Sequence, residues 1–251
     1  MVGTLLARGM LVGVVAGLLS FGFLKIYGEP QVDRAIAFEA QMDEAKAEAE
    51  KAKGMAMPAE EPELVSRPVQ AGIGLFTAVI VYSAAFGGLF GLAFAFAQGR
   101  VPGALSPQAL SALLAITGFI AIYLVPNLKY PANPPSVGDP ETIGIRTALY
   151  FGIIAISLAA IVGAIAFRRM LTEHYGDWNA TLMVGACYIA VMTAAGLVLP
   201  AINEVPDDFP AVVLWKFRIA SLGAQFIMWA TLGMLFGALT QRAATNGQPR
   251  T

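Results

Sequence analysis

The chain has 251 residues, of which 57% are hydrophobic and 13% are charged, and its mean hydropathy is +0.66. Soluble domains carry about a quarter charged residues, so the composition predicts an integral membrane protein. The formal net charge of −1 leaves no basic surface for nucleic acid. One cysteine, Cys187, excludes an intramolecular disulfide, and one histidine, His174, excludes a multi-histidine metal site within one copy of the chain.

Six apolar stretches approach or exceed the ~20 residues that a helix needs to cross a bilayer. They predict an all-α integral membrane protein with about six transmembrane helices. We interpret the first stretch as an uncleaved helix, because its apolar run exceeds that of a usual signal peptide. The six stretches are Leu5–Tyr27, Gln70–Ala97, Ala109–Val125, Thr147–Phe167, Thr181–Leu199 and Phe217–Thr240.

The connections alternate in length, which predicts three hairpins in a single membrane domain, 1–251. All the acidic residues except Glu173 and Asp177 fall on the side of the long connections. The raw count of Lys and Arg favours that side as cytoplasmic, but their density is higher on the short side. We therefore expect a multi-pass membrane protein with both termini cytoplasmic. The long connections are Gly28–Val69, Pro126–Arg146 and Pro200–Lys216, and the short ones are Gln98–Gln108 and Arg168–Ala180.

The first long connection, 28–69, is predicted to be an extramembrane insertion made of a charged helix and a proline-rich linker. Its first half is rich in Ala, Glu and Lys, which favour helix. Phe38, Met42, Ala45 and Ala49 fall on one face at helical spacing. Two interpretations are open: a solvated helix with a tether, or a helix that docks a partner.

The three hairpins resemble one another at their outer ends. The third stretch ends in LVPNLKYP and the fifth in LVLPAINEVP, and the stretches that follow open with IRTAL and FRIASL. Arg146 and Arg218 thus occupy the same place, and Arg67 opens the second stretch. The alternative to a repeat is convergence, because Pro and Arg are common at membrane edges. We expect Arg146 and Arg218 to form outer-face charge pairs with loop carboxylates or carbonyls.

No ionisable side chain lies in the middle of a predicted span, although transporters usually place such groups there. A pathway through the membrane would have to use neutral polar groups, among them Tyr82, Tyr188 and Gln225. The alternative for Gln225 is a hydrogen bond between helices. Small residues four apart, such as Gly87 with Gly91, predict close packing of helix backbones.

The outer loops carry oxygen donors that could hold a divalent cation, namely Asn133, Asp139, Glu141 and Glu204. The alternative is that these groups cap helices and pair with the arginines. Asp139 precedes Pro140, which is the pattern of a helix N-cap followed by proline at the first helical position.

Three long segments resemble the CbtA family of predicted cobalt transporter subunits: GEPQVDRAIAFE, LKYPANPPSVGDPETIGIRTALY and LPAINEVPDDFPAVVLWKFRIASLGAQFIMWATLG. The resemblance spans nearly the whole chain, and we expect it to be lowest around residues 43–64. It implies a protein of the bacterial inner (cytoplasmic) membrane, or of an archaeal one, with cobalt as the transported substrate and a link to cobalamin. We expect no tightly bound cofactor. It also implies a small single-helix partner, CbtB, that carries histidines this chain lacks.

Two functions from different classes follow. The first is a membrane-embedded subunit of a cobalt (Co²⁺) transporter, and the second is a non-transporting membrane scaffold or assembly factor whose proline-rich loops bind a partner protein. An enzyme is not expected, because no nucleophile–base pair is evident. The expected partners are the lipid bilayer and the CbtB-like subunit. Association with further copies of the same chain, as a homo-oligomer, is also open. A polar cavity from the outer loops to mid-membrane would favour transport.

Overall fold

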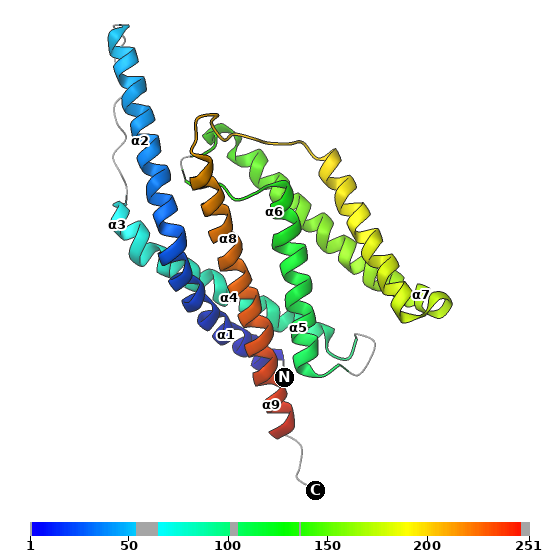
Figure 1. The fold of residues 1–251 in the computed structure, drawn as a ribbon. Coiled ribbons are helices and arrows are strands. Elements are labelled where there is room, and N and C mark those ends of the chain that lie inside the picture. The colour runs from blue at the N-terminus through cyan, green and yellow to red at the C-terminus, as the bar shows by residue number, and fades with distance from the viewer. Residues whose placement is uncertain (1, 54–64, 101–104, 136, 247–251) are drawn as a thin grey trace. The chain divides into compact units, whose positions relative to one another are not determined.

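A computed structural model describes residues 2–53, 65–100, 105–135 and 137–246, and all the regular secondary structure in this part of the chain is helical, with no strand. The α-helices are α1 (Val2–Phe23), α2 (Glu29–Ala52), α3 (Arg67–Val69), α4 (Leu75–Ala97), α5 (Pro107–Gly118), α6 (Val125–Lys129), α7 (Ile143–Val198), α8 (Ala211–Thr231) and α9 (Gly237–Asn246) (Figure 1). Short π-helical segments join several of them: η1 (Leu24–Gly28), η2 (Gln70–Gly74), η3 (Phe119–Leu124) and η5 (Leu232–Phe236).

Five continuous helices in the described residues are long and apolar enough to cross a membrane. This finding agrees with an all-α, multi-pass membrane protein. The five are Val2–Ala52, Arg67–Ala97, Pro107–Lys129, Pro140–Val198 and Ala211–Asn246. The count differs from six because the fourth helix, of 59 residues, contains both the fourth and the fifth predicted stretches.

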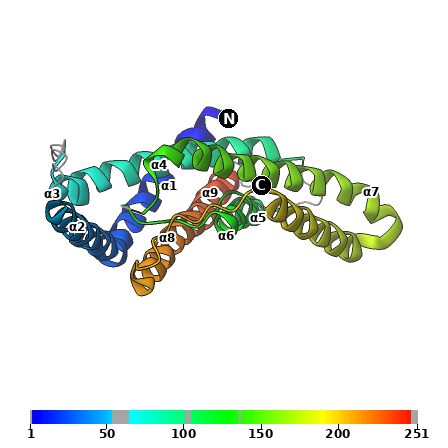
Figure 2. The ribbon, with the colours of Figure 1, turned by 90° about the horizontal axis from the view of Figure 1, so that it is seen from above.

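Helix α7 is broken at Gly176, which has φ 76° and ψ 164°. Glycine adopts this positive φ without the steric cost that a Cβ brings. The hydroxyl oxygens of Ser157 and Tyr188 lie 2.8 Å apart, whereas 31 residues of unbroken helix would span about 46 Å. The chain therefore folds back at Gly176 into two helical arms, which Figure 2 shows converging at the turn. The predicted short loop from Arg168 to Ala180 is almost entirely helical instead.

The chain forms two compact units. Unit 1 contains residues 1–116, 133–137 and 206–251, and unit 2 contains residues 117–132 and 138–205. In unit 1, α1 packs antiparallel against α8 and its continuation. The Ser20 hydroxyl donates to the Ala224 carbonyl, and the Arg8 guanidinium donates to the Thr240 hydroxyl. The two ends of the described chain, at Val2 and Asn246, therefore lie toward the same end of unit 1.

Glycines bring α1 and α4 into backbone contact in unit 1. A Cβ added at Gly87 would overlap the Gly9 carbonyl oxygen, and one added at Gly13 would overlap the Ser83 carbonyl oxygen. Apolar lipid gives no hydrophobic drive for helix association, so such close approach is a main source of stability. At Gly163 of α7, by contrast, an added Cβ meets nothing within 4 Å.

Two of the π-helical segments precede a proline in the same register. Ile26 and Tyr27 come before Pro30, and Ile122 and Tyr123 come before Pro126. Proline has no N–H to bond the carbonyl four residues earlier, and its ring would clash with that carbonyl. The helix widens by one π turn at this point, in η1 and in η3, and continues beyond the proline.

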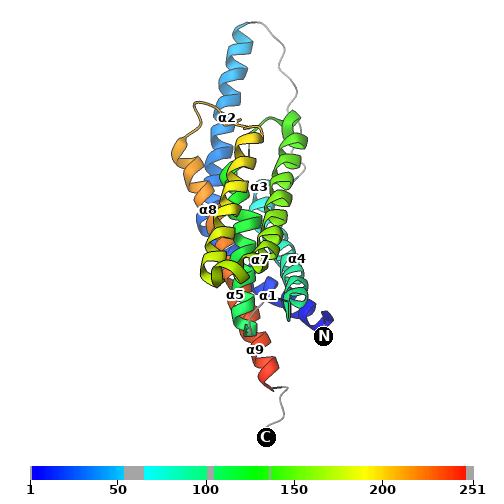
Figure 3. The same cartoon turned by 90° about the vertical axis from the view of Figure 1, so that its right-hand side faces the viewer.

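The predicted charged helix is present as α2, but it is not separated from the first span. Helix runs without a break from Val2 to Ala52, so the expected loop after Tyr27 is a direct extension of the span. The Phe38 ring packs edge-on against Phe209, with ring centroids 5.2 Å apart. In Figure 3 the light-blue part of α2 rises beyond the start of α8 in the same unit. The predicted linker around 54–64 lies outside the described residues.

We expect Gly87→Ala to destabilise the protein by about 1–3 kcal/mol, the usual cost of overpacking. The added methyl group would meet rigid backbone of α1 rather than a movable side chain. The free energy of unfolding of purified protein in detergent would measure the loss. Gly163→Ala is the matched control, because it adds the same methyl group in open space. Equal stability of the two variants would contradict the packing of α1 on α4.

Candidate outer-loop polar site

Three arginines stand where the chain re-enters an apolar helix, and each has a polar partner in one of the long connections. Arg67 opens α3, Arg146 lies in the first turn of α7, and Arg218 lies in the second turn of α8. A charge at a membrane edge needs either water or a protein partner. The partners of these arginines therefore decide which oxygen atoms of the loops stay free.

In unit 1, Arg67 binds two carboxylates of α2. Its Nη2 donates to Glu29 Oε2 and also to Asp33 Oδ1, the latter at 2.8 Å. Glu29 and Asp33 are four residues apart, which places them on one face of α2. The Glu29 side chain is 11% exposed, so Arg67 neutralises a largely buried carboxylate.

Arg218 in unit 1 binds the loop before α7. Its Nη2 donates to the side-chain oxygen of Asn133 over 2.9 Å. The structure thus places Asn133, one of the four predicted metal ligands, against an arginine, and its amide oxygen already accepts a hydrogen bond.

In unit 2, Arg146 and Glu204 come together. Arg146 Nε lies 3.3 Å from Glu204 Oε2 without the alignment of a hydrogen bond, so this contact is mainly Coulombic. Arg146 Nη2 donates to the Asp139 carbonyl at 3.0 Å. Glu204 also accepts from the Asp139 backbone N–H at 2.8 Å and from the Thr142 hydroxyl. One carboxylate therefore joins the loop after the fifth apolar stretch to the start of α7.

The other two predicted ligands in unit 2 differ in their engagement. Asp139 is the N-cap of the 3₁₀ turn η4 (Pro140–Thr142), and its Oδ1 accepts from the Glu141 backbone N–H at 2.9 Å. The Glu141 side chain is exposed. Across the described residues, no group of three or more His, Cys, Asp or Glu side chains is placed to hold a metal ion. His174 lies beside the turn at Gly176, where its Nδ1 is 3.3 Å from the Met170 carbonyl oxygen.

Sequence reasoning missed two residues that shape this cluster. Gly138 has φ +126°, and an added Cβ would overlap the Arg146 guanidinium, so glycine is needed both for the backbone and for the approach of the arginine. Thr142 supplies a hydroxyl donor to Glu204. The Gly-Asp-Pro sequence at 138–140 is a turn signal, but nothing in it points to Arg146.

The polar side chains predicted along a pathway are paired within each unit. In unit 1 the Tyr82 side chain of α4 lies close to the Gln225 side chain of α8. In unit 2 the Tyr188 hydroxyl bonds Ser157 between the two arms of α7. The Ser157–Tyr188 bond ties the two arms of α7 together.

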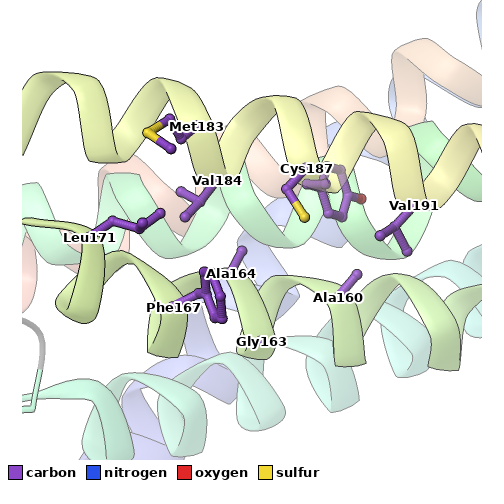
Figure 4. A pocket seen from close by; sticks show the side chains of 10 residues that line it. Ala160, Gly163, Ala164, Phe167, Leu171, Met183, Val184, Cys187 and Val191 are labelled. Atoms are coloured by element: carbon purple, nitrogen blue, oxygen red, sulfur yellow. The ribbon is translucent and has the colours of Figure 1, made fainter. Parts of the chain in front are cut away.

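The two arms of α7 enclose a groove of about 410 Å³. Small residues of the first arm face Cys187 and Val184 of the second, with the cysteine sulfur directed into the groove (Figure 4). Its only hydroxyl is that of Tyr188. The lining residues are Ala160, Gly163, Ala164, Phe167, Leu171, Met183, Val184, Cys187, Tyr188 and Val191. This groove is apolar and carries no carboxylate or imidazole.

Hydrogen bonds from Thr142 and from the Asp139 backbone, together with the charge of Arg146, lower the pKa of Glu204 below its ordinary value of 4.5, against a smaller opposing effect of burial. A carboxylate whose pKa is lowered by folding stabilises the folded state above its unfolded pKa. That stabilisation is lost as the pH falls through the folded pKa. The loop cluster should therefore loosen only at acidic pH.

We expect the melting temperature in detergent to fall as the pH is lowered below the ordinary carboxyl pKa of 4.5, because Glu204 then becomes protonated. Glu204→Gln should lower the melting temperature at neutral pH and flatten this acid limb. Glu141→Gln, in the same loop with an exposed side chain, should leave the limb as steep as in the wild type. An acid limb unchanged by Glu204→Gln would show that the cluster does not contribute.

Comparison with known families gives one match over nearly the entire chain. The family described as "Probable cobalt transporter subunit (CbtA)" matches residues 2–241. Comparisons with curated proteins and with solved structures found no match. The described helices agree with that description, since five of them can cross a membrane. The chain therefore belongs to the CbtA family of probable cobalt transporter subunits.

Proposed function

We propose that this chain is the membrane-embedded subunit of a bacterial inner-membrane Co²⁺ transporter linked to cobalamin metabolism, and that a partner subunit captures the metal. Capture by a partner subunit is supported by the loop oxygens, which already accept hydrogen bonds or face charged groups. Asn133 is bound by Arg218, and Glu204 is bound by Arg146 and Thr142. Metal binding at these atoms would have to displace existing partners, which is unfavourable for a weak oxygen-only site.

The chain has only one histidine, so it cannot surround a metal ion with imidazole nitrogens. Affinity of a site rises from Mn²⁺ towards Cu²⁺, so selective capture of cobalt depends on ligand type and geometry. A CbtB-like subunit with a single helix and several histidines would supply such ligands. We infer that Asp139, Glu141 and Glu204 at most pass the ion weakly, after the partner has bound it.

A pathway past the loops would use neutral oxygens. The Tyr82–Gln225 pair in unit 1 and the Ser157–Tyr188 pair in unit 2 are polar groups inside apolar helices. A polar group buried in lipid is costly unless it is paired. The side chains of each pair would have to separate before an ion could pass. That requirement favours a complex that uses an energy source over passive transport by a single chain.

The topology of unit 1 supports six crossings. Ser111 bonds the Gly233 carbonyl and Gln108 lies close to Gly237, so α5 runs antiparallel to the last long helix. The chain then leaves the membrane after α6 and returns in α8 from the same side. Helix α7 must cross an even number of times, and its turn at Gly176 fits two crossings. Both termini would lie together, on the side that we propose is cytoplasmic.

The scaffold is a second candidate, favoured by the apolar lining of the α7 groove. Transport predicts a polar route from the loops inward, whereas this groove suits a helix or lipid. Co²⁺ uptake into vesicles that contain this chain and its partner separates the two functions. If this chain is only a scaffold, Co²⁺ uptake should stay unchanged when the chain is removed after the rest of the complex has assembled.

We expect the purified chain to bind Co²⁺ with a dissociation constant weaker than about 10 μM, or roughly −7 kcal/mol. The reason is that its loop oxygens are engaged and its only imidazole is His174. Titration calorimetry with Co²⁺, repeated after addition of the partner, provides the test. Submicromolar binding by the chain alone, surviving His174→Ala, would disprove delegation to the partner and indicate an intrinsic site.

The topology predicts opposite accessibility for the two ends of unit 1. In a Cys187→Ser background, which has no other cysteine, Glu48→Cys on α2 should react with an impermeant maleimide added to intact spheroplasts. Thr245→Cys on α9 should react only after permeabilisation. The reverse pattern would invert the orientation, and labelling of both from outside would refute the crossing count.

A further inference from the structure

The end of unit 1 that holds Val2 and Asn246 carries basic side chains without acidic ones. Arg8 lies on α1, Arg100 follows α4 and Arg242 lies on α9. The last turns of α4 lie beside the start of α1, because α4 runs antiparallel to it with Gly91 against the Leu5 carbonyl. None of the helices α1, α4, α5, α8 and α9 contains Asp or Glu. The positive charge at this end therefore has no acidic partner within these helices.

Arg8 differs from the three outer arginines in its hydrogen-bond partner. Its Nη1 donates to the Thr240 hydroxyl at 3.1 Å, and no other partner lies among the described residues. A guanidinium has five N–H groups, so most of its donors have no acceptor in the described part of the chain. The outer arginines bind carboxylate or amide oxygens instead. Arg8 is half-buried, and a charge at a membrane edge needs an acceptor.

The bond to Thr240 fixes the direction of the Arg8 guanidinium. Thr240 is buried, so the arginine side chain is held between α1 and α9 and cannot extend freely into water. Arg242 is exposed and lies two residues beyond Thr240, roughly 200° around the helix, on the other side of α9. The open N–H groups of Arg8 are thus held at the junction of α1 and α9. A fixed guanidinium suits the paired oxygens of a phosphate group.

The depth of Arg8 in the membrane follows from the length of the first span. Tyr27 is 57% exposed, and exposed tyrosines mark the membrane–water interface. Arg8 and Tyr27 are separated by about 28 Å of helix at 1.5 Å per residue. The hydrocarbon core of a bilayer is ~30 Å thick. Arg8 therefore lies at the level of the headgroups of the opposite leaflet.

The surface of α1 next to Arg8 is apolar. Leu11 and Val15 lie three and seven residues beyond Arg8, which places them on the same side of the helix, toward the bilayer centre. They are 70% and 40% exposed. A ligand at this position would meet a charged donor at the headgroup level and an apolar surface below it. A soluble anion would use only the donor, whereas a phospholipid would use both.

We propose that Arg8 binds the headgroup of an anionic phospholipid. The phosphate accepts hydrogen bonds from the open N–H groups of Arg8, and an acyl chain lies along Leu11 and Val15. The lipid neutralises a half-buried charge for which the neighbouring helices offer no carboxylate. It thereby stabilises the contact of α1 with α9, and this role is independent of what the protein transports.

Native mass spectrometry of the full-length protein, titrated with phosphatidylglycerol or phosphatidylcholine in detergent, tests the proposal. We expect one phosphatidylglycerol to bind in preference to phosphatidylcholine. Arg8→Gln should weaken phosphatidylglycerol binding about fivefold, which corresponds to ~1 kcal/mol per basic residue near an anionic surface. Arg8→Lys keeps the charge and should keep most of the preference.

Arg242→Gln is the matched control, because it removes the same charge from the same end of unit 1 on the other side of α9. It should bind phosphatidylglycerol as the wild type does. Equal binding of the two lipids, or equal losses in Arg8→Gln and Arg242→Gln, would overturn the proposal. Displacement of the lipid by millimolar inorganic phosphate would also overturn it, and would show a site for a free anion.

Thermal melting provides a second measurement that does not require the Arg8→Gln variant to fold. Phosphatidylglycerol should raise the melting temperature of the wild type and of Arg242→Gln more than phosphatidylcholine does. An equal rise with the two lipids in the wild type would contradict a specific site at Arg8.

Discussion

The pairing of membrane-edge arginines with loop oxygens is the interaction on which the outer part of this structure depends. An arginine that begins a membrane helix must either reach water or find an acceptor on the protein. Arg67, Arg146 and Arg218 find acceptors on the long connections. The loops are thereby held to the helix ends by charge, and proline only limits the shapes that they can take.

This arrangement has a chemical consequence for a cobalt transporter subunit. Two of the four predicted metal ligands, Glu204 and Asn133, are partners of Arg146 and Arg218. Glu204 accepts from Thr142 and from the Asp139 backbone while it faces Arg146. An ion at Glu204 would meet the positive field of Arg146 as well as the carboxylate. Metal binding at Glu204 would therefore have to compete with Arg146 for the carboxylate.

The class of protein and its helices could be predicted from sequence because bilayer thickness demands long apolar runs. The partners Glu204 and Asp139 were also within reach, since loop carboxylates on the same side as Arg146 are few. The continuity from α1 into α2 could not be predicted from sequence, because a proline and a run of charges usually end a span. Here a π turn accommodates Pro30, and the helix continues.

The three arginines differ in which long connection supplies their partners. Arg67 binds Glu29 and Asp33 from the connection of its own hairpin. Arg146 of the second hairpin instead binds Glu204 of the third, and Arg218 of the third binds Asn133 of the second. The second and third long connections thus each supply a polar partner for the arginine that follows the other, whereas the first long connection supplies the partners of its own arginine.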